Sequence, residues 1–516
     1  MLGAFMHRRR VCWPLIAAAV LCGWILAPSL RADTWKVIEE SWYIVEIDGQ
    51  KAGWSAEIVE DDGRCYRTTV NQKLTISRGP NQTNTLELTT TYVETHRGDP
   101  VSASSRRLLS AEPESVTWTF EDGRVRERSE RGGRVVERTL PRPEGSWLMP
   151  RAASVLIESR RAGGAASIRC RTLDCTGELR VAAIDMTRGG QAAFDHGGRS
   201  LAVTIWTVRE LGADDRVMRT YESWIAEDGV LVRTIETAGS MRFIARLSTR
   251  EEAQRDWGGG PELLARTFVR PSQRIRAPHR TTSATYRLRV KEGPPPELPT
   301  IASQRVTSQE DGSLLLTITP GDPVRQAPEE DAPNGGAPDP KYLAATPLID
   351  CDDPVITDMA ARLIGAIEHA GDRAEALRLG VHRHLRAGGL ASAFASASEA
   401  ARGGAGDCSE HAVLLAALLR ARGVPARVAM GLVYAESFAG QRHIFAWHMW
   451  TQAWVDGRWI DLDATIDRPF SAAHILVATS ALNDGVLGDE FTRLLALMGN
   501  LEVEVVEVGY ERADAK

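Results

Sequence analysis

The sequence predicts an α+β protein in which a large antiparallel β domain precedes a C-terminal α+β domain. Three observations carry this prediction: Asp-Gly pairs separate runs of β-forming residues in the first half, a proline-rich stretch interrupts the chain at 319–346, and a well-capped helix followed by two strands comes after it. At 516 residues, the chain has room for three to four domains of about 150 residues each.

The composition is that of an ordinary globular protein. The chain is 43% hydrophobic and 25% charged, and its net charge is −6. These values exclude a wholly disordered chain and a multi-span membrane protein. They also indicate no basic field for nucleic acid, which is therefore not an expected partner.

Residues 1–32 are expected to be a signal peptide or an N-terminal membrane anchor. Arg8, Arg9 and Arg10 precede an uncharged apolar run that reaches about Leu30. The run is long enough to cross a bilayer once, and Ala27-Pro28-Ser29 offers a cleavage site. Both alternatives place the remainder outside the cytoplasm, in the periplasm or cell envelope.

Residues 33–260 are expected to form the antiparallel β domain. Segments rich in β-forming residues are bounded by pairs that favour tight hairpins, at Asp48-Gly49, Asp62-Gly63, Asp122-Gly123 and Asp228-Gly229. The segments 42–54 (WYIVEIDGQKAGW) and 224–236 (WIAEDGVLVRTIE) resemble exported bacterial half-barrel sheet domains. That resemblance implies a binding or scaffolding surface.

Three further segments complete the domain organisation. Residues 261–318 form a small β segment with a hairpin at Asp311-Gly312, residues 319–346 form a linker, and residues 347–516 form the C-terminal domain. Within the last, Met359 to about Ala387 is predicted to be helical, residues 472–479 and 501–508 are predicted strands, and residues 488–498 a helix.

A second helix of this domain places a cysteine at its first position. Asp407 is a good N-cap and Glu410 completes a capping box, while Gly423 and Pro425 end the helix. Cys408 therefore lies where unpaired N–H groups and the helix dipole favour a thiolate. Its backbone N–H is an expected oxyanion donor.

Two strands that follow bring a histidine and an aspartate together. The segment 448–465 (HMWTQAWVDGRWIDLDAT) reads as a hairpin turning at Asp456-Gly457. His448 begins the first strand and Asp463 ends the second, so the two ends meet. An aspartate beside a histidine orients the ring and stabilises its charged form.

These segments resemble one family. The stretch 406–434 (GDCSEHAVLLAALLRARGVPARVAMGLVY) and the hairpin above are similar to bacterial transglutaminase-like domains. The resemblance spans about 346–480 and implies a papain-like fold, with Cys408 as nucleophile, His448 as general base and acid, and Asp463 as the orienting carboxylate. Gln452 departs from the acidic residue often found there, and we expect it to point away from the site.

The remaining polar and aromatic residues have plainer expected roles. His411 is expected to pack or hydrogen-bond, His443 to lie in a loop, and Trp447 and Trp450 to line the pocket. No cofactor or metal ligand set is indicated.

Seven cysteines divide by location. Cys12 and Cys22 lie in the export segment, and five follow: Cys65, Cys170, Cys175, Cys351 and Cys408. Cys170 and Cys175 are close enough to clip a hairpin. Cys65 and Cys351 are expected to be small buried side chains.

Three functions remain open. The first is a cysteine peptidase or amidase, in which water resolves a thioester acyl-enzyme. The second is an acyl transferase that uses a primary amine, and the third is an envelope scaffold without turnover. The expected partner is a protein or peptide substrate, and the oligomeric state is not indicated.

Overall fold

The computed structural model describes residues 35–79, 82–108, 113–212, 215–321, 338–388, 395–483 and 494–511. The predicted export segment 1–32 lies outside these ranges, as do most of the linker and most of the helix predicted at 488–498. No helix within the described ranges is both long and apolar enough to cross a membrane.

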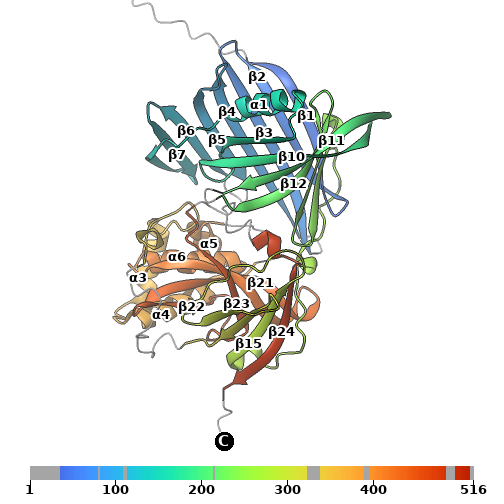
Figure 1. The fold of residues 1–516 in the computed structure, drawn as a ribbon. Coiled ribbons are helices and arrows are strands. Elements are labelled where there is room, and N and C mark those ends of the chain that lie inside the picture. Colours follow the sequence, from blue (N-terminus) through green and yellow to red (C-terminus); the bar gives the residue numbers. More distant parts are fainter. Residues whose placement is uncertain are drawn as a thin grey trace, which may run out of the picture. The chain divides into compact units, whose positions relative to one another are not determined.

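The N-terminal part is a sheet of fourteen described strands that run antiparallel to their neighbours (Figure 1). Their spatial order is β8-β7-β6-β5-β4-β3-β2-β1-β14-β13-β12-β11-β10-β9. The strands are β1 (Lys36–Ile47), β2 (Gln50–Asp61), β3 (Cys65–Gly79), β4 (Gln82–Thr95), β5 (Pro100–Leu108), β6 (Glu114–Glu121), β7 (Arg124–Arg131), β8 (Arg134–Pro141), β9 (Ser167–Asp174), β10 (Arg180–His196), β11 (Arg199–Leu211), β12 (Val217–Ala226), β13 (Leu231–Ala238) and β14 (Met241–Ser248). This architecture confirms the predicted large antiparallel sheet.

The predicted tight turn joins β1 to β2. Asp48 and Gly49 both adopt positive φ, at 50° and 80°, as a two-residue hairpin turn of the favoured hand requires. β1 also pairs with β14, from Trp42 opposite Ser248 to Ile47 opposite Phe243. The first and last strands of the segment are therefore neighbours in the middle of the sheet.

Two helices interrupt the region for which only strands were predicted. Helix α1 (Pro150–Ala162) follows β8, with Pro150 in its first turn, and contacts β9. The buried Glu94 accepts hydrogen bonds from the N–H groups of Arg151 and Ala152 at its start. The all-strand prediction was wrong here because such tertiary capping is invisible in the local pattern. Helix α2 (Arg250–Gln254) follows β14, capped by Thr249.

The segment 261–318 shares a sheet with the end of the chain. Strands β15 (Thr281–Val290), β16 (Gln304–Ser308) and β17 (Leu314–Ile318) join β24 (Leu501–Tyr510) in the order β16-β17-β15-β24. Tyr286 and Leu316 on these strands are fully buried in the same core cluster as helix α6. Three short 3-10 turns lie at Leu264–Thr267, Pro278–Arg280 and Pro340–Tyr342.

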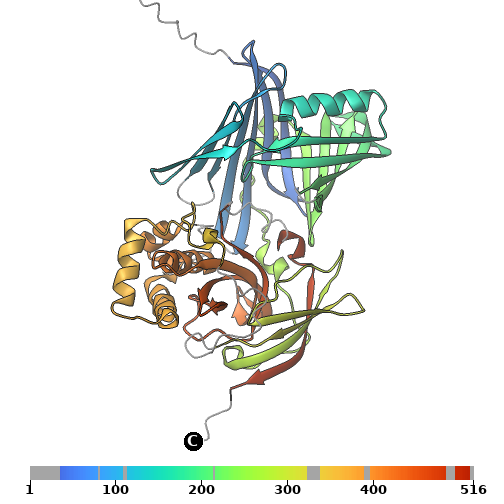
Figure 2. The same cartoon turned by 60° about the vertical axis from the view of Figure 1, so that its left-hand side comes forward.

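The last sheet has the order β22-β21-β20-β23, with helices gathered on one side of it (Figures 1 and 2). Its strands are β20 (Ala426–Phe438), β21 (Gln441–Val455), β22 (Arg458–Leu462) and β23 (His474–Ser480). The helices are α3 (Pro354–Ile364), α4 (Ala370–His384), α5 (Ala397–Gly403) and α6 (Cys408–Arg420), and a short parallel pair joins β18 (Arg386–Ala387) to β19 (Ala405–Gly406). The predicted α+β class is thereby confirmed.

Helix α6 is the centre of this core. Every residue from Ser409 to Arg420 is buried, so the helix packs on all sides, against β21, β20 and the neighbouring helices. The single helix predicted over Met359–Ala387 is instead two helices, because the chain turns at Gly365, whose φ is 50°.

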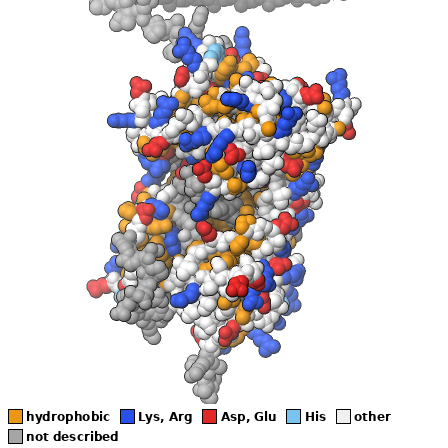
Figure 3. Space-filling model, viewed as in Figure 1, with side chains coloured by type: hydrophobic (Ala, Val, Ile, Leu, Met, Phe, Trp, Pro, Cys, Tyr) orange, Lys and Arg blue, Asp and Glu red, His pale blue; other side chains and the backbone are white. Residues whose placement is uncertain are grey.

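The surface mixes charges of both signs. On the face drawn in Figure 3, Lys and Arg side chains alternate with Asp and Glu, and apolar side chains lie between them. This distribution agrees with the small net charge of the chain.

Candidate active site

Cys408 is the first residue of α6, as predicted. The Asp407 side chain accepts hydrogen bonds from the N–H groups of Ser409 and Glu410, and the Glu410 carboxylate accepts one from Asp407 N. This cap leaves out the N–H of Cys408. A Cβ at Gly406 would lie 2.4 Å from Glu410 Cβ, so only glycine allows the chain to enter the helix this closely.

His448 lies inside β21 rather than at the start of a strand. The strand begins seven residues earlier than predicted, at Gln441, because it pairs with β20 from Gln441 to Ala453. His448 is opposite Gly431 of β20, its ring is hydrogen-bonded to Asp463, and the Cys408 side chain lies close enough to raise its pKa. His448 Nε2 donates to Asp463 Oδ2 over 2.7 Å, which leaves Nδ1 for the thiol.

Asp463 follows β22 directly, and the hairpin that precedes it fixes its place. Asp456 and Gly457 adopt φ of 50° and 81°, the turn predicted from the sequence, and pair Thr451 with Leu462. Asp463 Oδ1 accepts from Thr465 N over 2.8 Å. The buried Arg378 of α4 donates to the carbonyl oxygen of Asp463, so that a helix anchors the loop.

The electrostatics favour a charged imidazole beside an ionised carboxylate. Burial lowers the pKa of His448, but the Asp463 charge, the hydrogen bond to Asp463 and the Cys408 side chain outweigh burial and raise it to about 10. Burial also opposes ionisation of Asp463, and the two histidines nevertheless hold its pKa well below the usual range. The structure thus brings Cys408, His448 and Asp463 together as predicted.

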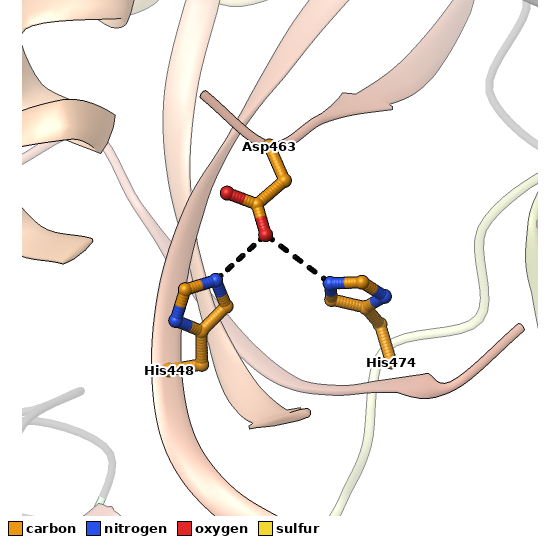
Figure 4. Close-up of side chains that lie close together, drawn as sticks. All are labelled: His448, Asp463 and His474. Carbon is orange, nitrogen blue, oxygen red and sulfur yellow. Dashed lines mark hydrogen bonds and ion pairs between the residues drawn. The ribbon is translucent and has the colours of Figure 1, made fainter. Parts of the chain in front are cut away.

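A second histidine, which the sequence pattern did not reveal, lies against the same carboxylate oxygen. His474 Nε2 is 3.3 Å from Asp463 Oδ2, and its ring is buried (Figure 4). His474 begins β23 within the apolar run Ala472–Val477. Its one sequence signal was a polar residue in an otherwise apolar strand, which does not identify a partner.

Other residues near the site have structural contacts. His411 is buried and its Nδ1 lies 2.7 Å from Asp407 O, which confirms the predicted hydrogen-bonding role. Gln452 binds Asp461 and Arg427, so it points away from the site as expected. Trp450 is fully buried, and its ring lies 6.2 Å from that of His448.

Three expectations about other residues were wrong. His443 lies in strand β21, not in a loop, with Nδ1 3.3 Å from the Tyr434 hydroxyl. Cys170 and Cys175 form no disulfide, and both are buried. Burial raises the pKa of Cys170, raises that of Cys175 to about 12, and also raises that of the buried Cys351. Cys351 is buried, as predicted, but Cys65 is only half-buried, because it begins β3 directly after a surface turn.

The ligand atoms of His448, Asp463 and His474 all lie within 4.8 Å of one another, a spacing that a metal ion could also bridge. The hydrogen bonds from both rings to Asp463 Oδ2 account for this spacing without an ion.

Comparison with solved structures returns low similarities. A β-barrel-like protein of the DUF1849 domain from Brucella abortus has 13% identity and a TM-score of 0.32, covering 41% of this chain and 95% of its own. A structure described as a "putative cysteine protease" from Cytophaga hutchinsonii has 17% identity and a TM-score of 0.28, covering 45% and 86%. A "putative protease" from Parabacteroides distasonis has 10% identity and a TM-score of 0.19, covering 74% and 68%.

No curated protein matches the chain. The family comparison is informative, because the Transglutaminase-like superfamily matches residues 357–464. That range includes Cys408, His448 and Asp463 and stops just before the loop that leads to His474. The chain therefore carries a transglutaminase-like superfamily domain at residues 357–464, which follows the large antiparallel β sheet in the sequence.

Proposed function

We propose that this protein is an exported cysteine enzyme that cleaves amide bonds of a protein or peptide through a thioester acyl-enzyme. The observation that carries the proposal is that Cys408, at the start of a buried helix, lies beside His448, whose ring is hydrogen-bonded to Asp463. A nucleophile, a base and an orienting carboxylate in series are the parts that acyl transfer needs.

In the first half-reaction, Cys408 gives its thiol proton to His448, and its Sγ attacks the amide carbonyl carbon. A C–S bond forms, and His448 gives its proton to the leaving nitrogen as the C–N bond breaks. The raised pKa of His448 keeps a proton on the ring near neutral pH, so the acid is ready when the amine leaves.

In the second half-reaction, a water molecule attacks the thioester. His448 takes its proton, the C–S bond breaks, and a carboxylic acid leaves. Asp463 stays ionised throughout and stabilises the imidazolium. The N–H of Cys408 serves as one oxyanion donor, because the Asp407 cap uses those of Ser409 and Glu410 instead.

Alkylation tests the nucleophile. Iodoacetamide at neutral pH is expected to label Cys408 first, and Cys408→Ala is expected to abolish that label. Cys351→Ala is the matched control, because this buried thiol has a pKa raised by burial and should react slowly. Labelling that spares Cys408 in the folded protein would sink the proposal and favour a scaffold without turnover.

The acceptor is tested separately. A glutamine peptide is incubated with a fluorescent amine: ammonia release without incorporation of the amine indicates a hydrolase, whereas incorporation indicates an acyl transferase. Water is always available as an acceptor, which favours hydrolysis. Substrate trapping in envelope extracts, comparing Cys408→Ala with the wild type, then identifies the substrate.

The cellular location is tested by fractionation. We expect the protein in the periplasm or the cell envelope, and sequencing of its N-terminus distinguishes a cleaved signal from a retained anchor. Recovery of the full-length chain in the cytosol would refute export.

A further inference from the structure

His474 is a buried polar group whose contacts the two half-reactions above do not use. It is 3% exposed and begins β23, opposite Val433 of β20. Its ring stacks on Phe470, with centroids 4.2 Å apart, and lies edge-on to Trp450. This aromatic packing fixes the plane of the ring and therefore the direction of its two nitrogens.

Both nitrogens of His474 face oxygens that accept hydrogen bonds. Nε2 lies 3.3 Å from Asp463 Oδ2, and Nδ1 lies 3.1 Å from the backbone oxygen of Ser471. A carbonyl oxygen only accepts, and so does an ionised carboxylate. Both hydrogen bonds form together only when each nitrogen carries a proton.

Asp463 consequently receives donors from three elements. Thr465 N binds Oδ1, whereas His448 and His474 both bind Oδ2. A carboxylate with three donors cannot rotate without losing at least one of them, and buried polar groups are costly to leave unpaired. The hydrogen bond from His474 therefore holds Asp463 Oδ2 in the position where it accepts the hydrogen bond from His448.

We propose that His474 is a positioning residue for the reaction, which donates a hydrogen bond to Asp463 Oδ2 and thereby sets both the orientation and the charge that Asp463 presents to His448. This inference rests on the proposed function for its catalytic consequence, but its structural part is tested without turnover.

The charged and titratable groups around His448 determine the direction in which its pKa should change when His474 is replaced. Cys408 of α6, Asp463 after β22 and His474 of β23 face His448, and His411 of α6 interacts with Asp463. A donor on Asp463 weakens the hold of its carboxylate on His448. Removing that donor should raise the pH at which His448 loses its proton.

The experiment is a titration of the His448 ring by NMR in the full chain, in a Cys408→Ser background that removes the thiol. In His474→Phe, which keeps an aromatic ring on Phe470, the midpoint is expected to rise by at least about 0.5 pH unit. The shift is expected because the Asp463 carboxylate has lost one hydrogen-bond donor and holds the His448 proton more strongly, and 0.5 pH unit is about a threefold change in that equilibrium.

Two variants serve as controls. His474→Gln retains an amide donor and should move the midpoint part of the way back toward the wild-type value. Phe470→Leu removes the ring that holds the plane of His474, so the midpoint should move in the same direction as in His474→Phe, by a smaller amount. Circular dichroism and thermal melting confirm that each variant folds.

Turnover supplies the second readout, with Cys408 restored. His474→Phe is expected to lower kcat/KM on an amide substrate about tenfold, mainly through kcat. A wild type without turnover refutes the proposed function, while the titration still decides the role of His474. An unchanged midpoint of the His448 titration in folded His474→Phe overturns the inference. One equivalent of tightly bound zinc in the wild type, removable by a chelator, also overturns it, because the three side chains would then be metal ligands.

Discussion

Asp463→Asn tests the electrostatic core of the site, because it removes one charge and almost no volume. The pKa of His448 is about 10 against an ordinary 6.5, and a difference of this size corresponds to about 5 kcal/mol in favour of the charged ring. Asp463 is the largest contributor that raises this pKa. Losing even half of the 5 kcal/mol lowers the ratio of charged to neutral ring about 50- to 100-fold at any given pH, which moves the pKa from about 10 to about 8.

The assay is the pseudo-first-order rate of Cys408 alkylation by iodoacetamide, followed by mass spectrometry between pH 5.5 and 10. In Asp463→Asn, His448 should lose its proton near pH 8 and not near pH 10, so at pH 9 the charged ring beside the Cys408 thiol should be about five- to tenfold less populated. The rate at pH 9 should fall by a similar factor, whereas at pH 6.5, where the ring is charged in both proteins, the two rates should be close.

Asp461→Asn is the matched control. Asp461 is also buried and lies two residues away, but it accepts from Trp450, Gln452 and Ser303 and not from His448. Its substitution should leave the alkylation profile in place. Equal rates for wild type and Asp463→Asn at pH 9, in protein shown to be folded, would refute the reasoning.

Three further predictions concern stability. Burial, and then the charge of Asp407, raise the pKa of Glu410 to about 7, so the folded state keeps a proton that the unfolded state loses above about pH 4.5. The wild type should therefore lose stability as the pH rises from about 4.5 through 7. Urea unfolding of Glu410→Gln should show no such pH dependence. Gly431→Ala would place a Cβ 2.0 Å from Ile475 O and force β23 from β20, so we expect a loss above about 3 kcal/mol in the same assay, and a normal melting curve would contradict it. Arg420→Ala removes a buried guanidinium that donates to three backbone carbonyls, and calorimetry should show a loss of about 3 kcal/mol, whereas less than about 1 kcal/mol would count against this role.

The sequence alone determined those features that depend on residues a few positions apart, namely helix caps and hairpin turns. The capping box at Asp407 and Glu410 fixes the start of α6, since its hydrogen bonds span only four residues. The turn at Asp456 and Gly457 fixes the register of the β21–β22 hairpin in the same way. Both devices act over short distances along the chain, so the order of residues is enough to place Cys408 and Asp463 on their elements.

Contacts between elements distant in sequence were decided only by the tertiary structure. Helix α1 depends on Glu94, which lies 57 residues before Arg151 in the chain. The β24 strand joins β15 across more than 200 residues. A pattern of apolar residues predicts that a strand exists, but it does not specify which strand will be its neighbour.

His474 illustrates the same limit at the site. The sequence determined a cysteine at a helix start and a histidine and an aspartate on adjoining strands, because the hairpin and the cap are local. The tertiary structure alone brought β23 beside β20 and placed His474 on Asp463 Oδ2. The physical reason is that a buried carboxylate is completed by whichever donors the packed core brings to it, and their identity depends on packing across the whole domain.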